Sequence, residues 1–293
     1  MNQMILAPPT GLQPAGDGGQ DARLVEIWLS TKTSGHTRRA YAAEVARFRG
    51  FVSKPLLAVT LADLQDWAAR LGEGRLQPAS QNRALTAVKS LLSFGQETGY
   101  LPYNVGAAVK LRPHRSALAE RILQDSEVVR LIEAAPEGRD RVLLKLLYAS
   151  GLRVSEACGL EWRHAMPRKE GGQITVFGKG GKTRSILLRP GVWEMLLSIR
   201  GEADPGQAVF RSRRGGPLDS SRVRRIVYAA ARKAGLEQRV SPHWMRHAHA
   251  SHALDRRAPI HLVQATLGHA SVATTGRYLH ARPTESSGFY LPD

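Results

Sequence analysis

Residues 139–156 read RDRVLLKLLYASGLRVSE. The first eleven positions carry apolar side chains on almost every side of a helix, namely Val142, Leu143, Leu144, Leu146 and Leu147. A helix that is apolar all round lies buried inside a protein. The stretch therefore predicts a central core helix over residues 139–149.

A charged pair directly follows this predicted helix. After Ser150 and Gly151, Arg153 and Glu156 stand three positions apart. For an isolated arginine and glutamate at this spacing, a structural ion pair is the simpler interpretation. A functional role for Arg153 and Glu156 would require further candidate residues elsewhere in the chain.

The remainder of this half of the chain predicts helices and one small sheet. Short apolar runs at 173–177 and 183–188 flank a glycine-rich turn, which is typical of a β-hairpin. Helical patterns surround the hairpin, at residues 125–135, 191–200, 219–234, 242–255, 259–267 and 271–279. The expected fold is therefore mainly α with a small β-sheet.

The first half of the chain predicts a small helical bundle over residues 21–105. One amphipathic stripe, at positions i, i+4, i+7 and i+11, comprises Tyr41, Val45, Phe48 and Val52. Thr60 followed by Asp63 resembles a capping box at the start of the next helix, which extends through Leu71. A further helix is expected over residues 85–98.

Two segments lack such patterns. Residues 1–20 are rich in glycine and proline and predict a flexible tail. Around residues 106–119 the helical stripe fades while basic residues accumulate, which predicts a linker. The chain is therefore expected to hold a helical domain over residues 21–105 and a second domain over residues 120–293.

The charge of the chain points to its partner. Its 293 residues include 42 Lys and Arg against 25 Asp and Glu, a formal net charge of +17. Residues 1–117 hold 14 basic and 8 acidic residues, and residues 118–293 hold 28 and 17, so both halves are positive. A surplus of this size favours binding to a polyanion such as nucleic acid. An arginine-rich surface kept for solubility is the alternative.

The composition disfavours other classes of protein. Cys158 is the only cysteine, which excludes a disulfide framework and a cysteine-based zinc site and fits a reducing, cytoplasmic setting. No stretch approaches the roughly eighteen apolar residues of a membrane span, and the start of the chain lacks a signal-peptide pattern. We therefore expect a soluble, cytoplasmic protein.

Residues 241–246, SPHWMR, open a helix with basic side chains. Ser241 is a suitable N-cap and Pro242 a natural first residue, so His243 and Arg246 lie on one face of the first turn. Free backbone N–H groups there already favour an anion, and the two side chains add charge and donors, which predicts a bound phosphate. A basic surface helix is an equally good interpretation of this segment alone.

Four histidines on this predicted helix also suggest a metal site. They are His243, His247, His249 and His252. The zinc motif with two histidines four positions apart requires a glutamate directly after the first, where this chain has Trp244. No coherent carboxylate shell accompanies the histidines, so metal catalysis is disfavoured.

The glycine-rich turn of the predicted hairpin, GKGGKT at residues 178–183, resembles the end of a nucleotide-binding P-loop. However, Val176 stands where the P-loop needs its first glycine, and a strand rather than a helix follows. The better interpretation is a hairpin tip that carries Lys179 or Lys182 to a phosphate or to a leaving oxygen.

Two further candidates lie near the end of the chain. His269 follows Leu267 and Gly268, and Tyr278 lies nine residues after His269 on a short predicted helix. Most tyrosines in such places are core anchors with a hydrated hydroxyl, so Tyr278 is not distinctive by itself.

Taken together, these candidates form a recognisable order. Arg153, Lys179, His243, Arg246, His269 and Tyr278 occur in a sequence, spacing and context that resemble the tyrosine recombinase (phage integrase) family, including its Xer-type members. The resemblance is carried by SGLRVSE at 150–156, GKG at 178–180, PHWMRH at 242–247 and the segment 267–278. It implies that residues 120–293 form an α+β catalytic domain. It also implies that residues 21–105 form a helical, SAM-like core-binding domain, although this first part resembles the family only in its helical pattern and its position in the chain.

The resemblance implies a transesterification without ATP, metal or other cofactor. Tyr278 would attack a DNA phosphodiester and leave a 3′-phosphotyrosyl link with a free 5′-hydroxyl. Arg153 and Arg246 would hold the non-bridging oxygens of the phosphate. His243 and His269 would donate to the same oxygens or assist proton transfer.

Two more roles are implied for the same site. Lys179 would protonate the departing 5′-oxygen, with Lys182 as the open alternative. Glu156 would orient one of the residues that touch the phosphate. Here the chain departs from the family, because only fifteen residues, Pro283 among them, follow Tyr278, which disfavours the long carboxy-terminal exchange helix of Xer-type members. The apolar segment 289–291 remains a candidate for a short plug that inserts into a neighbouring protomer.

The resemblance further implies a site-specific recombinase that exchanges strands through a Holliday junction. Its partners would be double-stranded DNA with a specific recombination site, further copies of the chain in a homotetramer on two duplexes, and accessory DNA-bending or directionality proteins. The residues expected to contact DNA are Arg38, Arg39, Arg83, Lys89, Lys110, Arg112 and Lys182. A type IB topoisomerase and a catalytically idle DNA-binding protein of the same fold are the alternatives.

Overall fold

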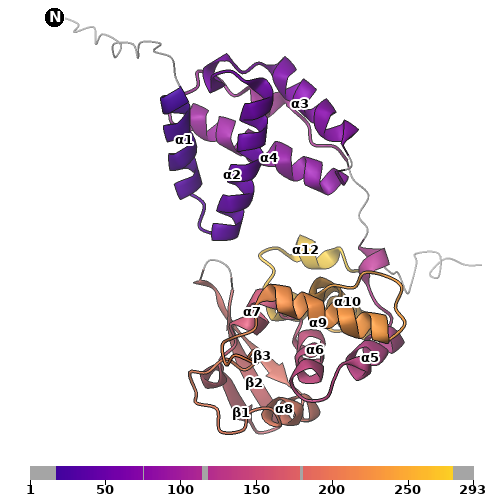
Figure 1. The fold of residues 1–293 in the computed structure, drawn as a ribbon. Coiled ribbons are helices and arrows are strands. Elements are labelled where there is room, and N and C mark those ends of the chain that lie inside the picture. Colours follow the sequence, from indigo (N-terminus) through magenta and orange to yellow (C-terminus); the bar gives the residue numbers. More distant parts are fainter. Residues whose placement is uncertain (1–17, 75, 114–117, 179–180, 280–293) are drawn as a thin grey trace, which may run out of the picture. The chain divides into compact units, whose positions relative to one another are not determined.

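The computed structural model describes residues 18–74, 76–113, 118–178 and 181–279 (Figure 1). The chain divides between Arg115 and Ser116 into two compact units, and each is described by itself. Lys179 and the apolar segment 289–291 lie outside the described residues, as does most of the predicted tail.

The first unit is helical throughout its described part. Its α-helices are α1 (Gly18–Ser30), α2 (Gly35–Val52), α3 (Leu61–Glu73) and α4 (Pro78–Glu97), with short 3₁₀ turns at Leu56–Ala58 and Val105–Ala108. The predicted stripe on α2 is confirmed, because Val45 and Phe48 are buried and Tyr41 and Val52 pack against the same core. Helix α1 begins at Gly18, inside the segment predicted as a tail.

The predicted capping box at the start of α3 is confirmed. The Thr60 hydroxyl accepts a hydrogen bond from the backbone N–H of Asp63, and the Asp63 carboxylate accepts one from the backbone N–H of Thr60 at 2.7 Å. The ammonium of Lys54 also lies 2.6 Å from this carboxylate. The hydrogen bonds from Lys54 and from the Thr60 backbone lower the pKa of Asp63 to about 2.

The described part of the basic segment after α4 packs onto the helical unit. Val109 is buried in the same core. Asn82 of α4 holds the backbone of Arg112, accepting from its N–H at 3.0 Å and donating to its carbonyl at 2.8 Å. The chain is therefore anchored to the first unit as far as residue 112.

The second unit combines helices with one small sheet. In chain order it contains a 3₁₀ turn at Ala119–Arg121, α5 (Asp125–Ala134), α6 (Arg139–Ser150), α7 (Val154–Cys158), a 3₁₀ turn at Trp162–His164, β1 (Ala165–Arg168), β2 (Gly171–Phe177), β3 (Thr183–Leu188), α8 (Pro190–Leu197), α9 (Ser220–Lys233), α10 (Pro242–Asp255), α11 (Ile260–Leu267) and α12 (Val272–Gly276). The mainly α fold with a small sheet is confirmed.

The sheet is antiparallel in the order β1, β2, β3. The predicted hairpin is confirmed, with Phe177 paired to Thr183 at its tip. Strand β1 was not predicted, because the sequence Ala-Met-Pro-Arg lacks β-branched residues and carries a proline, which only an edge strand tolerates. A side chain at Gly172 would overlap the ring of Trp193, so this glycine lets α8 lie directly against β2.

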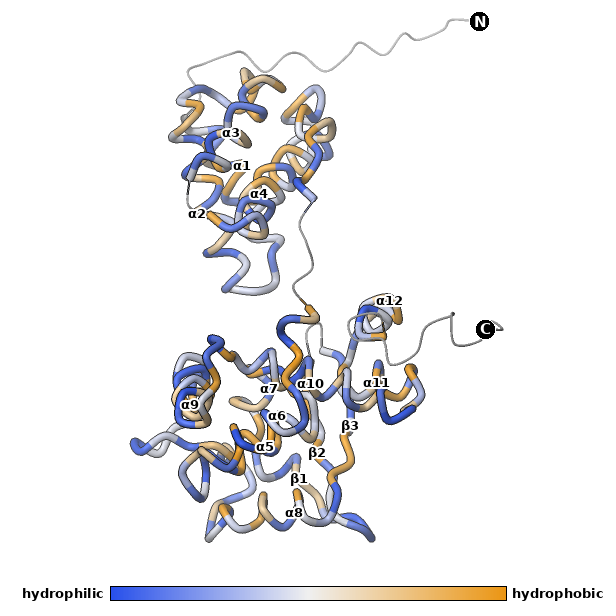
Figure 2. Tube along the Cα trace, turned by 90° about the vertical axis from the view of Figure 1, so that its right-hand side faces the viewer, coloured by the Kyte–Doolittle hydropathy of each residue, from blue (hydrophilic) through white to orange (hydrophobic). Residues whose placement is uncertain are grey.

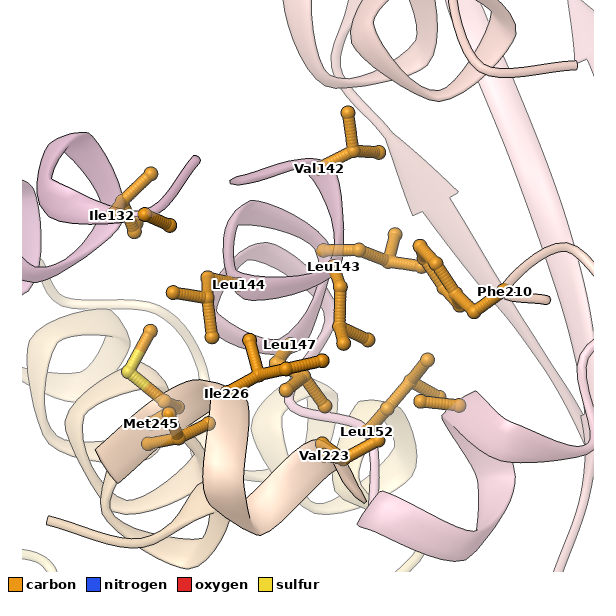
Figure 3. Close-up of a cluster of buried hydrophobic side chains, with 14 of the residues drawn as sticks. Ile132, Val142, Leu143, Leu144, Leu147, Leu152, Phe210, Val223, Ile226 and Met245 are labelled. Carbon is orange, nitrogen blue, oxygen red and sulfur yellow. The ribbon is translucent and has the colours of Figure 1, made fainter. Parts of the chain in front are cut away.

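Helix α6 is the central core helix that its sequence predicts. Leu143 and Leu144 are fully buried, and Leu147 is almost so. Figure 3 shows these side chains pointing to different sides of α6, where they meet Phe210, residues of α9 and Met245 of α10. The helix therefore joins the sheet side of the unit to the helices that carry the candidate site.

Helix α9 has two distinct faces. Val223, Ile226 and Val227 are buried, whereas Arg222 and Arg225 are exposed. Figure 2 shows the resulting alternation of hydrophilic and hydrophobic residues along α9. Within the described ranges of both units, no helix is long and apolar enough to cross a membrane.

Candidate active site

Arg153 is positioned by the turn that ends α6. Gly151 adopts the left-handed conformation with φ of +60°, and a Cβ there would lie 2.7 Å from Leu267 and 2.8 Å from His249. The chain then turns into α7, where Arg153 is the N-cap. Its guanidinium donates to the carboxylate of Glu156 at 2.9 Å and to the carbonyl of Gly268 at 3.2 Å. The ion pair predicted from their spacing is therefore present.

Glu156 is buried between two arginines. Besides Arg153, the guanidinium of Arg184 donates to both carboxylate oxygens, at 2.9 and 2.8 Å. Burial alone raises the pKa of Glu156, but the hydrogen bonds from Arg184 and from the Arg153 backbone outweigh it and lower the pKa to about 2. Glu156 therefore carries a fixed negative charge that holds Arg153 in place.

Arg246 is a buried cation whose hydrogen bonds go to backbone carbonyls. Its side chain is 4% exposed. It donates to the carbonyl of Gly151 and, at 2.7 Å, to the carbonyl of Leu267. Burial and the nearby charge of Arg153 lower the pKa of Arg246 to about 10. A buried arginine without a carboxylate hydrogen bond, close to a second arginine, creates a site for an anion.

Two predicted histidines lie at the same place. His243 begins α10 as predicted, with Ser241 at the N-cap and Pro242 first in the helix. His269 contacts the Thr275 hydroxyl through Nδ1 at 2.9 Å. Burial, together with the charges of Arg246 and Arg153, lowers the pKa of each histidine, to about 4 for His269. Both rings are therefore neutral near pH 7 and lie close to the two arginines.

Tyr278 completes the group, buried at 6% exposure against α10 and α11. Its ring lies parallel to that of His269, with 6.4 Å between the ring centroids. Its hydroxyl is 2.8 Å from Nδ1 of His247. Burial raises the pKa of Tyr278, while the charges of Arg246 and Arg277 act in the opposite direction.

The structure therefore brings together five of the six residues that the motifs single out. They are Arg153, His243, Arg246, His269 and Tyr278. The sixth, Lys179, lies outside the described residues. Lys182 is exposed beside the hairpin tip, where its carbonyl accepts a hydrogen bond from the N–H of Gly178 at 2.7 Å. Strand β3 follows the glycine-rich turn, so a P-loop is excluded.

The four histidines of α10 do not converge. His249 contacts the carbonyl of Tyr148, and His252 lies between the Tyr148 hydroxyl and the carbonyl of Leu123. Nowhere in the described parts of the chain do three or more histidine, cysteine or acidic side chains gather as metal ligands would. The sequence indicates neither the contact of His247 with Tyr278 nor that of Arg184 with Glu156, because nothing in the local spacing points to either.

The residues predicted to contact DNA differ in their surroundings. Arg38, Arg39 and Lys110 are exposed. Arg83 pairs with Glu44 at 3.2 Å. The remaining two of the first unit make contacts within it, since Lys89 donates to the carbonyl of Val109 and Arg112 to that of Ala68.

Known families and proteins resemble this chain along most of its length. A sequence model described as "Phage integrase family" matches residues 121–285, and one described as "Phage integrase, N-terminal SAM-like domain" matches residues 24–98. Tyrosine recombinase XerC of Xanthomonas campestris pv. campestris is 33% identical over 270 residues, which cover 88% of this chain and 82% of the relative. Tyrosine recombinase XerD of Corynebacterium glutamicum is 32% identical over 279 residues, covering 87% and 90%.

Solved structures share the fold. The crystal structure of XerA recombinase is 28% identical, with a TM-score of 0.52 over 92% of this chain and 96% of that one. A lambda integrase tetramer bound to a Holliday junction is 20% identical, with a TM-score of 0.72 over 90% and 77%. The second likeness supports the fold alone.

Proposed function

Because this chain belongs to the phage integrase family of tyrosine recombinases and is a site-specific DNA recombinase, we propose that Tyr278 attacks a DNA phosphodiester held by Arg153 and Arg246. One observation carries this assignment. The adjacent carbonyls of Leu267 and Gly268 accept hydrogen bonds from Arg246 and Arg153, and the next residue, His269, stacks on Tyr278. The segment 267–269 therefore contacts both arginines of the anion site and the proposed nucleophile Tyr278.

The two arginines supply the charge that a phosphodiester needs. Arg153 is held by Glu156, and Arg246 donates to backbone carbonyls, so each keeps a fixed orientation. Guanidinium groups match the non-bridging oxygens of phosphate and stabilise the additional negative charge of the transition state. His243 and His269 donate to the same oxygens, and Glu156 is a positioning residue for Arg153.

The reaction exchanges one ester for another. The bond between the Tyr278 oxygen and phosphorus forms while the bond between phosphorus and the 5′-oxygen breaks, which leaves a 3′-phosphotyrosyl link and a 5′-hydroxyl. Lys179 protonates the departing oxygen, with Lys182 as the alternative donor. Because the ester is conserved, the step is reversible and consumes no ATP, and our proposal includes no metal or other cofactor.

The domain roles belong to the same proposal. Residues 21–105 act as the DNA clamp, and residues 120–293 form the catalytic domain. The segment 106–119 joins the two, and its part up to residue 112 packs onto the first unit. Strand exchange between two duplexes needs four active sites, so the working form is a homotetramer on DNA, as lambda integrase is on its Holliday junction. Accessory DNA-bending or directionality proteins act with it, and the DNA substrate places the enzyme in the cytoplasm.

The alternatives are not favoured by the relatives. The tyrosine recombinases XerC and XerD named above match 88% and 87% of this chain. Neither a type IB topoisomerase nor a catalytically idle DNA-binding protein is needed to account for the site.

A covalent-capture experiment tests the assignment. The full chain is incubated with a pool of nicked duplexes of randomised sequence, and protein bound covalently to DNA is resolved on a denaturing gel. We expect adducts that converge on one sequence, are lost in Tyr278→Phe and persist in Tyr228→Phe, a control at an exposed tyrosine of α9. Absence of adducts from the wild type on a selected binding sequence would refute the assignment. Adducts on arbitrary sequences together with relaxation of supercoils would favour the topoisomerase.

A further inference from the structure

His247 occupies a place that neither the resemblance nor the motif assigns. It follows Arg246 on α10, and its Nδ1 lies 2.8 Å from the hydroxyl oxygen of Tyr278. The ring centroids are 5.7 Å apart, with 47° between the ring planes. Within the described part of the chain, the Tyr278 hydroxyl hydrogen-bonds to Nδ1 of His247.

Other bases near Tyr278 are already engaged. The carboxylate of Glu156 accepts from Arg153 and Arg184. His269 uses Nδ1 for the Thr275 hydroxyl. Across the described ranges, no carboxylate is found in hydrogen-bond contact with Tyr278. His247 is therefore the group placed to take a proton from the nucleophile.

The surroundings keep His247 able to accept. Burial, together with the charges of Arg121, Arg246 and Arg277, lowers its pKa to about 4. The ring is therefore neutral near pH 7, and a neutral imidazole has one nitrogen with a free lone pair. The Tyr278 hydroxyl must give up a proton, because an attacking tyrosine reacts as the phenolate.

We propose that His247 is the catalytic proton acceptor for Tyr278. As the bond from the tyrosine oxygen to phosphorus forms and the bond to the 5′-oxygen breaks, the phenolic proton moves to Nδ1 of His247. In the reverse step, the 5′-hydroxyl returns its proton to the general acid and attacks the phosphotyrosine. The bond from the tyrosine oxygen to phosphorus breaks, and His247 returns its proton to the phenolic oxygen. The inference rests on the proposed role of Tyr278 as nucleophile.

The charges around His247 also explain when the transfer takes place. The positive charges of Arg246 on α10, Arg121 in the 3₁₀ turn at Ala119–Arg121 and Arg277 next to Tyr278 act on the ring. His243 stacks on it from one turn away. These charges disfavour an imidazolium. A bound phosphate opposes the charge of Arg246, so proton transfer becomes easier only once DNA occupies the site.

The test uses the full chain and the nicked duplex selected by covalent capture. The oxygen of asparagine lies where Nδ1 of histidine lies, so His247→Asn keeps an acceptor for the tyrosine hydroxyl but cannot take its proton. We expect this variant to bind the duplex normally and to cleave about 100-fold more slowly or worse in a single turnover. The matched control is His249→Asn, on the same helix but in contact with Tyr148, which we expect to cleave close to the wild-type rate.

Two readouts separate proton transfer from a structural role. In His247→Asn, the cleavage rate should rise about tenfold per pH unit, because only the ionised phenol reacts, whereas the wild type should be nearly independent of pH. A fluorinated, more acidic tyrosine at position 278 should restore most of the rate of His247→Asn. His247→Ala should respond in the same way, and it serves as the second variant if the asparagine variant fails to fold.

The outcomes distinguish this inference from the proposed function. A wild type without a Tyr278-dependent adduct would overturn both. If the wild type forms the adduct and His247→Asn cleaves at the same rate, the inference is overturned while the function stands. A slow variant whose rate is independent of pH and is not restored by the acidic phenol would show that His247 only holds Tyr278 in place.

Discussion

Arg184 holds both carboxylate oxygens of Glu156, at 2.9 Å from Nη1 and 2.8 Å from Nη2. Its Nε also donates to the carbonyl of Thr266 at 2.7 Å. Arg184 thereby fixes the residue that orients Arg153 and the segment before His269. The side chain of Arg184 thus connects strand β3 to the residues of the candidate active site.

Loss of Arg184 should weaken both stability and cleavage. In Arg184→Met, the buried carboxylate of Glu156 loses one of its two partners, so we expect the free energy of unfolding to fall by about 3 kcal/mol. Urea unfolding measures this, with the exposed Arg189→Met as the control. Cleavage at saturating DNA should fall as well, because Arg153 is no longer oriented. An unchanged unfolding midpoint would contradict this account.

Glu156 should contribute to the acid sensitivity of the fold. Its pKa is about 2 in the folded protein, below its ordinary value of 4.5. The stability that it contributes is therefore complete above pH 4.5 and is lost as the pH falls towards 2, by about 3 kcal/mol in all. Urea unfolding between pH 2.5 and 6 should show a shallower pH dependence for Glu156→Gln than for the wild type. Parallel curves would show that the carboxylate is not stabilised as described.

Gly151 should tolerate no side chain. In Gly151→Ala, a Cβ would lie 2.7 Å from Leu267 and 2.8 Å from His249, and the backbone would remain left-handed. Gly99→Ala is the matched control, since it has φ of +74° but open space around it. We expect a loss of about 1 kcal/mol for Gly99→Ala from the backbone alone. Gly151→Ala should lose clearly more, together with cleavage, because its carbonyl anchors Arg246. Equal thermal unfolding shifts would refute the packing argument.

The positive charges should divide into two functional groups. Arg153→Ala should lower the cleavage rate about 100-fold or more with DNA binding largely retained. Arg38→Ala, at an exposed site of the first unit, should weaken binding and reduce the slope of log affinity against log salt by about 1, with little effect on cleavage at saturating DNA. Filter binding over a series of salt concentrations and single-turnover cleavage measure the two effects. The reverse pattern would show that the roles are exchanged.

A sulfur leaving group should identify the general acid. A duplex with a 5′-thio bridge at the scissile position needs no proton on departure, so it should restore cleavage by Lys179→Ala. Lys182→Ala should show no such rescue. If the thio substrate instead rescues Lys182→Ala and leaves Lys179→Ala slow, Lys182 is the acid.

Local patterns were sufficient to predict much of this protein. Four predicted features depend only on residues within a few positions of one another, and the structure contains each of them. They are the core helix α6 with apolar residues on all sides, the apolar stripe on α2, the capping box at Thr60 and the β2–β3 hairpin. The types and order of the residues that we propose as catalytic are likewise readable from the chain. Helix periodicity and turn chemistry are short-range properties, so the sequence alone is enough to determine them.

The tertiary structure decided which side chains meet. Arg184 reaches Glu156 across 28 positions, and His247 reaches Tyr278 across 31. Strand β1 exists only because β2 pairs with it. The contacts of Arg184 and His247 have no local signature, because each depends on how α10, α11 and the sheet pack around α6. The sequence therefore determined which reactive side chains this chain carries, and packing determined that His247 contacts Tyr278, the nucleophile that we propose.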